Sequence, residues 1–336
     1  MSAHEIKKKA LQMGYVSCGI IPSITFDEYN KYLDERVSSF PDSEEKYKRF
    51  YNYVQPPEFA KSIIVCVQRI NQYKVPESLN GRVGKNYLFD SRLPFVHEYR
   101  ARQEFEAYIK TLGINILEFI VPERWAAVKA GLVKFGRNNF VYTDEHGSYI
   151  RIHVWVVDKE LEYDAISQDT LMPGCSEDCL ICVRECPTQA LSGSFSMDLV
   201  KCVTQLSTFA TDIPSETERS QMGLWLYGCD VCQDVCPMNK DKMLESEEFT
   251  LLANYEEYLT PERVLAMDED TYINVVNPRF WYMGKDGLWL WKCNALRIMI
   301  NSGKTEYHHI IKEHCNHEDA RLKEIALWGC RKLGIS

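Results

Sequence analysis

Eight of the thirteen cysteines in this chain follow a pattern that can bind iron–sulfur clusters. Seven of them fall in two runs, C-x3-C-x2-C-x3-C-P over residues 175–187 and C-x2-C-x3-C-P over residues 229–237, and Cys202 stands alone between the runs. In bacterial two-cluster ferredoxins, the last cysteine of such a run binds the other cluster. The sequence therefore predicts two [4Fe–4S] clusters and a chemistry that proceeds in single-electron steps.

The same pattern predicts that the two runs exchange one ligand each. The first cluster is expected to be held by Cys175, Cys179, Cys182 and Cys236, and the second by Cys186, Cys202, Cys229 and Cys232. The gap between the first two cysteines is one residue longer than the usual x2, which loosens the assignment of Cys175 more than that of its neighbours.

Structural zinc sites and disulfides are the two alternatives to iron–sulfur ligation by these cysteines. Structural zinc also binds C-x2-C pairs, but a zinc ribbon has no need of a third cysteine followed by proline. The proline fixes φ directly after the last ligand. Disulfides fit less well, since this cysteine density without a signal peptide suits a reducing compartment.

Bulk properties predict a cytoplasmic globular protein with two or three packed units. The chain has 336 residues, 45% of them hydrophobic and 26% charged. No apolar run approaches the roughly 18–20 residues that span a bilayer, so no membrane partner is expected. The net charge of −9 argues against a surface that is basic throughout, although a local basic patch would be enough to contact nucleic acid.

Three regions are expected, at residues 1–165, 166–245 and 246–336. In the first, apolar runs at 16–21, 62–68, 114–120 and 150–157 predict strands, and the segments between them predict helices, the longest over 93–112. This alternation predicts an α/β (α+β) domain with a central sheet. The second region is expected to be a ferredoxin-like cluster segment, with a short helix over 197–207 that carries Cys202.

The third region is expected to be helical, with helices over 288–300, 306–315 and 319–332. Helix pairs of this length are typical of HEAT-type hairpins, although a helical cap on the core fits the pattern equally well. Residues 285–336 carry nine Lys and Arg against six Asp and Glu, which is compatible with a tRNA contact and also with an ordinary solvated helical face.

Residues 121–140 form the other distinctive segment. The pattern predicts a helix that ends at Gly131, a turn around Gly136, and exposed Arg137, Asn138 and Asn139. A glycine in such a turn lets the backbone approach a ligand closely, but an ordinary helix–turn–strand junction has the same pattern.

This segment resembles a known family. Residues 127–140 (A-V-K-A-G-L-V-K-F-G-R-N-N-F) and the following Gly147-Ser148 are similar to the A-V-(R/K)-A-G-L-G-x-x-G-(K/R)-N-x-L…G-S signature of epoxyqueuosine reductases, which are related to reductive dehalogenases. The order of the cysteine motifs, Cys202, Y-G-C-D-V-C-Q-D-V-C-P over residues 227–237 and the helical tail agree with it. The resemblance implies a nitroreductase-like N-terminal domain with cobalamin beside one cluster, and a flavodoxin or ferredoxin as electron donor.

The chain also departs from this family. The family's aspartate proton donor corresponds to Phe119, and Gly131-Leu-Val-Lys134 replaces G-L-G-W/R, which indicates a divergent relative. Glu118 is the nearest acid; apolar neighbours could raise its pKa and make it a general acid, whereas a solvated glutamate would have no such role. The other candidate catalytic residues are Tyr99 and Tyr142. The candidate cofactor-binding residues are Lys134, Gly136, Arg137, Asn138 and Asn139.

These features together predict a reductase. Its two clusters are expected to pass electrons one at a time to a bound corrinoid, for removal of oxygen from a queuosine precursor in tRNA or of a related leaving group. Two alternatives remain: an electron-transfer protein of the ferredoxin kind with no substrate site, and a reductive partner of another corrinoid protein. The first alternative predicts no deep pocket in residues 1–160.

Overall fold

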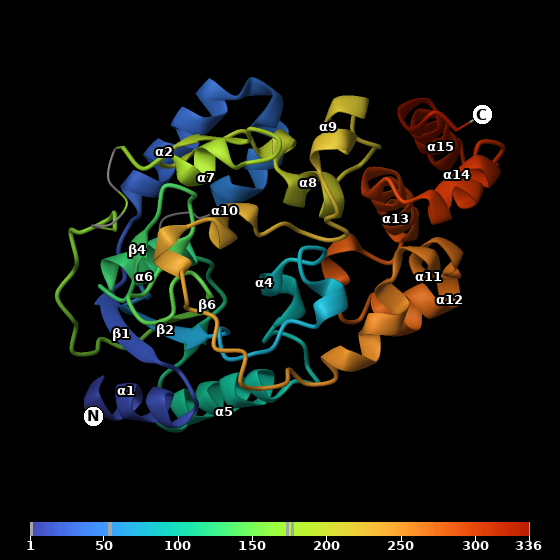
Figure 1. The fold of residues 1–336 in the computed structure, drawn as a ribbon. Helices are drawn as coiled ribbons and strands as arrows, with labels where there is room; N and C mark the ends of the chain where they lie inside the picture. Colours follow the sequence, from blue (N-terminus) through green and yellow to red (C-terminus); the bar gives the residue numbers. More distant parts are fainter. Residues whose placement is uncertain (1–2, 53–55, 173–174, 176–177, 336) are drawn as a thin grey trace.

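The computed structural model describes residues 3–52, 56–172, 175 and 178–335. Residues 173–174 and 176–177, within the predicted cluster segment, lie outside the described residues. Figure 1 shows a sheet with its covering helices at one side of the molecule and the C-terminal helices at the other. Within the described residues, no helix combines the length and apolar character needed to cross a membrane.

The N-terminal part contains a four-stranded sheet in which every neighbouring pair is antiparallel. In spatial order its strands are β1 (Ser17–Pro22), β2 (Ser62–Arg69), β6 (Ile150–Val157) and β3 (Ile116–Leu117). Three of the predicted strands are confirmed, whereas the fourth, expected over 114–120, is reduced to two residues. The reason is local: the Phe119 amide donates to the Leu117 carbonyl at 2.8 Å, which turns the chain away from β6.

Helices cover both faces of this sheet. On one face, α1 (Ala3–Gln12) and α5 (His97–Thr111) pack buried side chains such as Phe105 against the strands. On the other face, α6 (Glu123–Lys129) contributes Trp125 and small alanines to a second core. The mixed helix and strand content fits the predicted α/β (α+β) class.

The remaining elements connect the sheet to the cluster segment and the tail. They are α2 (Asp27–Ser39), α3 (Glu44–Tyr47), α4 (Lys85–Leu88), β4 (Lys134–Phe135), β5 (Val141–Tyr142), α7 (Ile181–Arg184), β7 (Leu191–Gly193), β8 (Ser196–Met197), α8 (Val203–Thr208), α9 (Glu216–Gln221), α10 (Val231–Asp234), α11 (Pro261–Ala266), α12 (Glu269–Thr271), α13 (Leu288–Ser302), α14 (His308–His314) and α15 (Ala320–Leu333).

Cys202 does not lie inside a helix, and the expected helix over 197–207 is wrong in this respect. A short 3-10 turn over Leu199–Lys201 precedes it, and Cys202 is the extended N-cap residue of α8. The extended conformation interrupts the helical hydrogen-bonding pattern at this residue, so the thiol is presented from the junction between two short elements.

The three predicted helices of the tail correspond to α13, α14 and α15, and Gly303 ends α13 in the left-handed conformation with φ 65°. One hydrophobic core combines residues from all three regions, for example Leu88, Tyr227 and Trp291. The rings of Tyr227 and Trp291 stack with their centroids 5.1 Å apart. The regions therefore share a core, which holds the cluster segment between the sheet and the tail.

Candidate redox site

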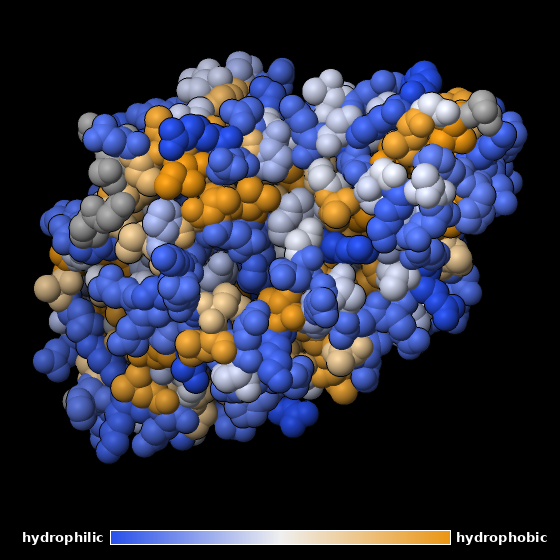
Figure 2. Space-filling model, viewed as in Figure 1, coloured by the Kyte–Doolittle hydropathy of each residue, from blue (hydrophilic) through white to orange (hydrophobic). Residues whose placement is uncertain are grey.

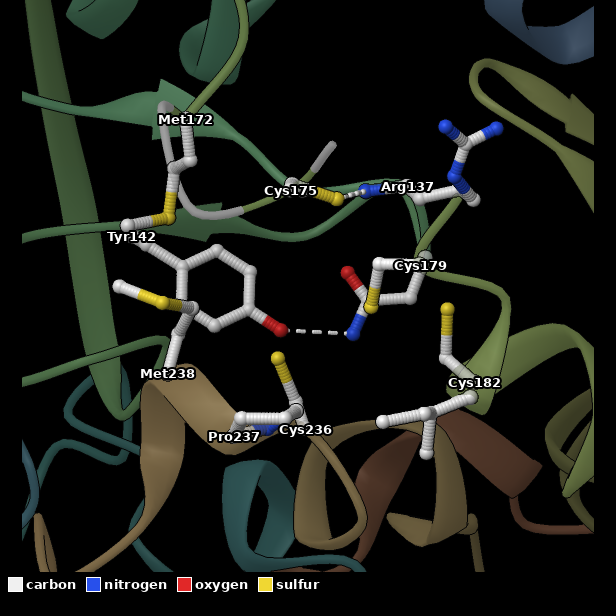
Figure 3. Close-up of a pocket in the computed structure, with 12 residues that line it drawn as sticks. Arg137, Tyr142, Met172, Cys175, Cys179, Cys182, Cys236, Pro237 and Met238 are labelled. Atoms are coloured by element: carbon white, nitrogen blue, oxygen red, sulfur yellow. Dashed lines mark hydrogen bonds between the residues drawn. The ribbon is translucent and has the colours of Figure 1, made fainter. Parts of the chain in front are cut away.

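The four thiols predicted to hold the first cluster line one cavity. Cys175, Cys179 and Cys182 come from the first run, and Cys236 comes from the second. Figure 3 shows their sulfur atoms turned toward a common space beside Tyr142. Burial, together with the charges of the neighbouring Cys175 and Cys236, raises the pKa of Cys182 to about 11.

The other four thiols also lie together. Cys186, from the first run, packs in one apolar cluster with Cys202 and Cys232. Burial raises the pKa of Cys232, and the charges of Cys229, Cys202 and Cys186 raise it further. Each run thus contributes its last cysteine to the group of the other run, as the two-cluster pattern predicts.

This donor set fits two iron–sulfur clusters. Buried thiols resist ionisation, and coordination by a metal removes the proton and offsets that cost. Backbone amides point at the sulfurs as well: the Arg137 N–H donates to Cys175 Sγ at 3.2 Å, and the Ala190 N–H donates to Cys186 Sγ at 3.3 Å. Such bonds help to set the reduction potential of a cluster.

A polar network frames the first cavity. The Asn138 Nδ2 donates to Tyr142 Oη at 2.7 Å and to the Cys232 carbonyl at 2.8 Å, so it links the two thiol groups. Since the Tyr142 oxygen accepts from Asn138, its own hydrogen is available to the Cys236 sulfur, with which it forms a hydrogen bond. Burial, followed by the charge of Cys236, raises the pKa of Tyr142.

The predicted exposure of Asn138 and Asn139 is wrong. Their exposed fractions are 4% and 8%, because this segment packs between the first cavity and the rest of the N-terminal part. Gly136 is required here for close packing: a Cβ on it would lie 2.6 Å from Cε2 of Tyr142. Both signature residues, Gly136 and Asn138, therefore build the wall of the cluster cavity.

A second cavity, of about 250 Å³, adjoins the first. The two cavities share β5, because Val141 lines the second and Tyr142 lines the first. Successive strand residues point to opposite faces, so a single extended strand separates the clusters from this space. The second cavity is lined by four arginines, Arg92, Arg102, Arg124 and Arg151.

Acidic groups balance most of this positive charge. Asp90 pairs with Arg92 at 2.9 Å and with Arg151 at 3.6 Å, and Glu106 pairs with Arg102 at 2.9 Å. Burial lowers the pKa of Arg151 to about 10, although Asp90 opposes this. Four arginines against Asp90, Glu106 and an ionised Glu123 leave a surplus of one positive charge around the cavity, and protonation of Glu123 raises this surplus to two.

Two titratable groups inside the cavity have shifted pKa values. Burial, with the nearby arginines, lowers the pKa of His153 to about 3, so this imidazole is neutral near pH 7. Glu123 is exposed to solvent at the cavity. Partial desolvation of its carboxyl group raises its pKa against the opposing effect of the arginines. Among the described residues, Glu123 is the one carboxylate that lines this cavity.

The predicted catalytic and cofactor-binding residues are spread over several places. Tyr142 lines the first cavity with Gly136, Arg137 and Asn138. Lys134 pairs with Asp169 at 3.2 Å, Tyr99 is half-buried on α5, and Glu118 is exposed and lines neither cavity. None of the five residues predicted to hold a corrinoid lines the second cavity.

The sequence reasoning missed Glu123 and the arginines of the second cavity. A signal was present in Arg151 and His153, which are polar residues inside an otherwise apolar strand. Glu123 also stands in the first turn of α6, directly after Pro122. Their convergence could not be read from the sequence, because they come from elements far apart in the chain.

Exchange of ligands between the runs can be tested with Cys236→Ser. Because Cys236 lies with the thiols of the first run, we expect the loss of the first cluster and retention of the second. Iron and acid-labile sulfide should fall from about eight to about four atoms each per chain. Cys186→Ser should remove the second cluster instead, and Cys293→Ser, a buried thiol outside both motifs, should change neither. Retention of full iron in Cys236→Ser would contradict the assignment.

The bond from Tyr142 to Cys236 predicts a shift in reduction potential. Tyr142→Phe removes a donor that stabilises negative charge on the sulfur, so the potential of the first cluster should become more negative. Loss of about 1 kcal/mol in a one-electron couple corresponds to a shift on the order of 40 mV. Anaerobic redox titration followed by electron paramagnetic resonance measures it. Tyr149→Phe, whose hydroxyl donates to Asp234 at 3.1 Å, is the matched control and should leave the potential in place.

Comparison with known proteins agrees with this geometry. A family model described as a 4Fe-4S double cluster binding domain matches residues 175–239. The epoxyqueuosine reductase of Cellulophaga algicola is 28% identical over 256 residues, which cover 72% of this chain and 80% of the relative. The epoxyqueuosine reductase of Staphylococcus aureus is 36% identical over 132 residues, covering 39% of this chain and 33% of that protein.

Solved structures extend the similarity to the fold of almost the whole chain. Epoxyqueuosine reductase from Streptococcus thermophilus superposes with a TM-score of 0.79 at 20% identity, covering 98% of this chain and 90% of that one. The Bacillus subtilis enzyme, solved with its catalytic loop swung out of the active site, gives a TM-score of 0.77 at 22% identity over the same shares. The resemblance predicted from the sequence is thus confirmed: the relatives and solved structures to which this chain is similar are named epoxyqueuosine reductases, and the matched segment is a double-cluster domain.

Proposed function

We propose that this protein is an iron–sulfur reductase whose two clusters deliver single electrons to a substrate in the arginine-lined cavity. The observation that carries the proposal is the shared wall: β5 presents Tyr142 to the first cluster's thiols and Val141 to the second cavity. An electron leaving that cluster has one extended strand to cross. The polar groups on the far side are placed to bind a substrate and to supply a proton.

The names of the relatives supply the substrate of this proposal, an epoxyqueuosine-type group in tRNA. One similar structure is of epoxyqueuosine reductase with an epoxyqueuosine-modified tRNA stem loop, at 20% identity and a TM-score of 0.75. Removal of the epoxide oxygen as water breaks two C–O bonds, forms a C=C bond and takes two electrons and two protons. The clusters would supply the electrons one at a time, and the cavity would supply at least one proton.

Glu123 is the proton donor of this proposal. Its carboxyl group lines the cavity, and its raised pKa favours the protonated form that a general acid requires. Glu118, the candidate predicted from the sequence, is exposed and lines neither cavity. The neutral imidazole of His153 and the guanidinium groups would orient the substrate.

The family resemblance also implies cobalamin, which would supply a strongly reducing cobalt centre. The residues present do not fit it in this arrangement. The five residues predicted to hold it lie on the cluster side or in other contacts, and a cavity of about 250 Å³ is below the roughly 300–1,000 Å³ of pockets that take drug-sized ligands. A corrinoid is larger than such ligands. The proposed electron path therefore runs from the first cluster to the substrate without it.

A small electron-donor protein, flavodoxin or ferredoxin, is part of the proposal. Figure 2 shows hydrophobic residues gathered over α7 and α10, the two helices that follow the first ligands of each run. Leu180, next to Cys179, is 38% exposed there. An apolar patch beside a cluster ligand suits a transient redox partner, which needs close approach and little buried area.

The second cavity favours a reductase over an electron carrier. A large ferredoxin with no substrate site has no use for buried arginines around a cavity, since burying each charge is costly unless it is paired or binds a ligand. In the other alternative, a reductive partner of another corrinoid protein, this chain would dock to that protein and would convert no substrate itself.

Anaerobic turnover tests the proposed function. Reconstituted protein is mixed with an epoxyqueuosine-modified tRNA stem loop and a low-potential chemical reductant, with and without added cobalamin, and the nucleosides are analysed by mass spectrometry. Conversion to the deoxygenated nucleoside is the expected result. Absence of conversion in both mixtures, with both clusters intact, would overturn the substrate assignment. Conversion only with cobalamin, accompanied by a base-off shift in its visible spectrum, would restore the predicted corrinoid.

The role of Glu123 predicts a specific loss of rate. General acid catalysis contributes about 10²–10⁴-fold, so Glu123→Gln should lower kcat by a factor of this order. Because the acid form is active and the pKa is raised, the parent rate should fall as pH rises through a value above the ordinary carboxyl range of about 4.3. This limb of the pH profile should be absent in the variant.

Glu118→Gln is the matched control, with the same change of side chain five residues before the start of α6 and outside the cavity. Its rate should stay within twofold of the parent. A loss in Glu118→Gln with none in Glu123→Gln would instead support the donor predicted from the sequence.

A further inference from the structure

An exposed aromatic surface lies at the edge of the arginine-lined cavity. Tyr282, which lines the cavity, stacks with Trp281: the ring centroids are 4.2 Å apart and the planes differ by 15°. The guanidinium group of Arg92, also on the cavity wall, lies 5.4 Å from the Trp281 ring and 5.1 Å from the Tyr282 ring. Trp281 is 43% exposed, so the stack ends in an indole that contacts solvent.

The stack is held rigidly. Tyr282 makes edge contacts with Tyr87 at 5.3 Å and Phe209 at 5.9 Å, and Arg92 donates a hydrogen bond to its hydroxyl group. The loop beneath it is fixed at both ends. The Phe280 carbonyl accepts from Tyr227 Oη at 3.1 Å, and the Gly284 carbonyl accepts from Asn277 Nδ2 at 2.9 Å. The loop holds the Trp281 indole in place but leaves much of it uncovered by the rest of the chain. A rigidly held, exposed aromatic ring is suited to bind a ligand.

The chemistry around the stack identifies the ligand. Bases of single-stranded nucleic acid stack on aromatic side chains and on guanidinium planes, and their phosphates seek positive charge. Here the aromatic surface and Arg92 adjoin a cavity with three further arginines and a surplus of one positive charge. The chain as a whole has a net charge of −9, so a local surplus of positive charge is a departure from the rest of the protein. Such a surplus favours binding of a polyanion at this edge.

We propose that Trp281, supported by Tyr282 and Arg92, stacks on an unpaired base of a single-stranded RNA loop and thereby positions a neighbouring nucleotide over the arginine-lined cavity. The inference rests on the proposed function in one respect, since it assigns a contact to the RNA of that proposal. The residues of this contact lie outside 285–336, the segment whose charge the sequence analysis found compatible with a tRNA contact and also with an ordinary solvated helical face. Trp281 acts as a positioning residue, because it lies outside the space in which the reduction would occur.

Binding of RNA to the oxidised holoprotein tests this inference without any turnover. The probe is a fluorescein-labelled RNA hairpin with a seven-nucleotide loop and no modified base, and the readout is anisotropy. Stacking is worth about 1–3 kcal/mol per base, so Trp281→Ala should weaken binding about 5- to 150-fold. Trp281→Phe keeps a ring and should recover most of the affinity. Phe59→Ala, which removes another exposed aromatic ring (61% exposed), is the matched control and should stay within twofold of the parent.

A blunt-ended RNA duplex without a loop is the second probe, and it should bind more weakly than the hairpin and respond to none of these variants. Iron content and circular dichroism establish that each variant is folded. Equal affinity of parent and Trp281→Ala for the hairpin, equal affinity for hairpin and duplex, or no RNA binding by the parent would each overturn the proposal. Loop binding that depends on Trp281, in a protein that fails to reduce epoxyqueuosine, would retain this contact and reject the proposed reaction.

Discussion

The exchange of one thiolate between the two cysteine runs is the constraint on which the rest of the structure depends. Cys236 must reach the thiols of the first run, and Cys186 must reach those of the second, so α7 and α10 have to pack against each other. Asn138 reinforces this arrangement from the N-terminal part by bonding the backbone of Cys232. The fold of this segment therefore brings the thiols of both groups into place together.

The N-terminal part supports the clusters through the same short segment that closes them off. Arg137 and Tyr142 direct a backbone amide and a hydroxyl group at ligand sulfurs of the first cluster. Because successive residues of β5 face opposite ways, the strand that carries Tyr142 also carries a wall of the second cavity. The family signature thus serves the electron-transfer side of the site, and a different set of residues lines the second cavity.

Charge distribution separates the two sides. The cluster side contains thiols that accept hydrogen bonds from backbone N–H groups and whose negative charge bound iron would offset, whereas the second cavity holds arginines that Asp90 and Glu106 balance only in part. Desolvation favours the uncharged form of both titratable groups there: it lowers the pKa of His153 and raises the pKa of Glu123. Electrons and protons would therefore reach the second cavity from different elements, which lets each supply be altered separately by mutation.

The sequence by itself predicted a double-cluster cysteine segment, three of the four sheet strands and the helices of the tail, because these follow from spacing along the chain. Its assignment of individual thiols to the two clusters stays a prediction. The sequence did not determine that Cys202 is the extended N-cap residue of α8, or that β3 has only two residues. Local backbone conformation and the turn between Leu117 and Phe119 decide these features. The sequence prediction also misplaced Asn138 and Asn139 on the surface. The second cavity was decided by tertiary structure alone. Arg92, Glu123, Arg151 and Tyr282 come from four separate segments, and only the folding of the sheet against the cluster segment and the tail brings their charges and rings together.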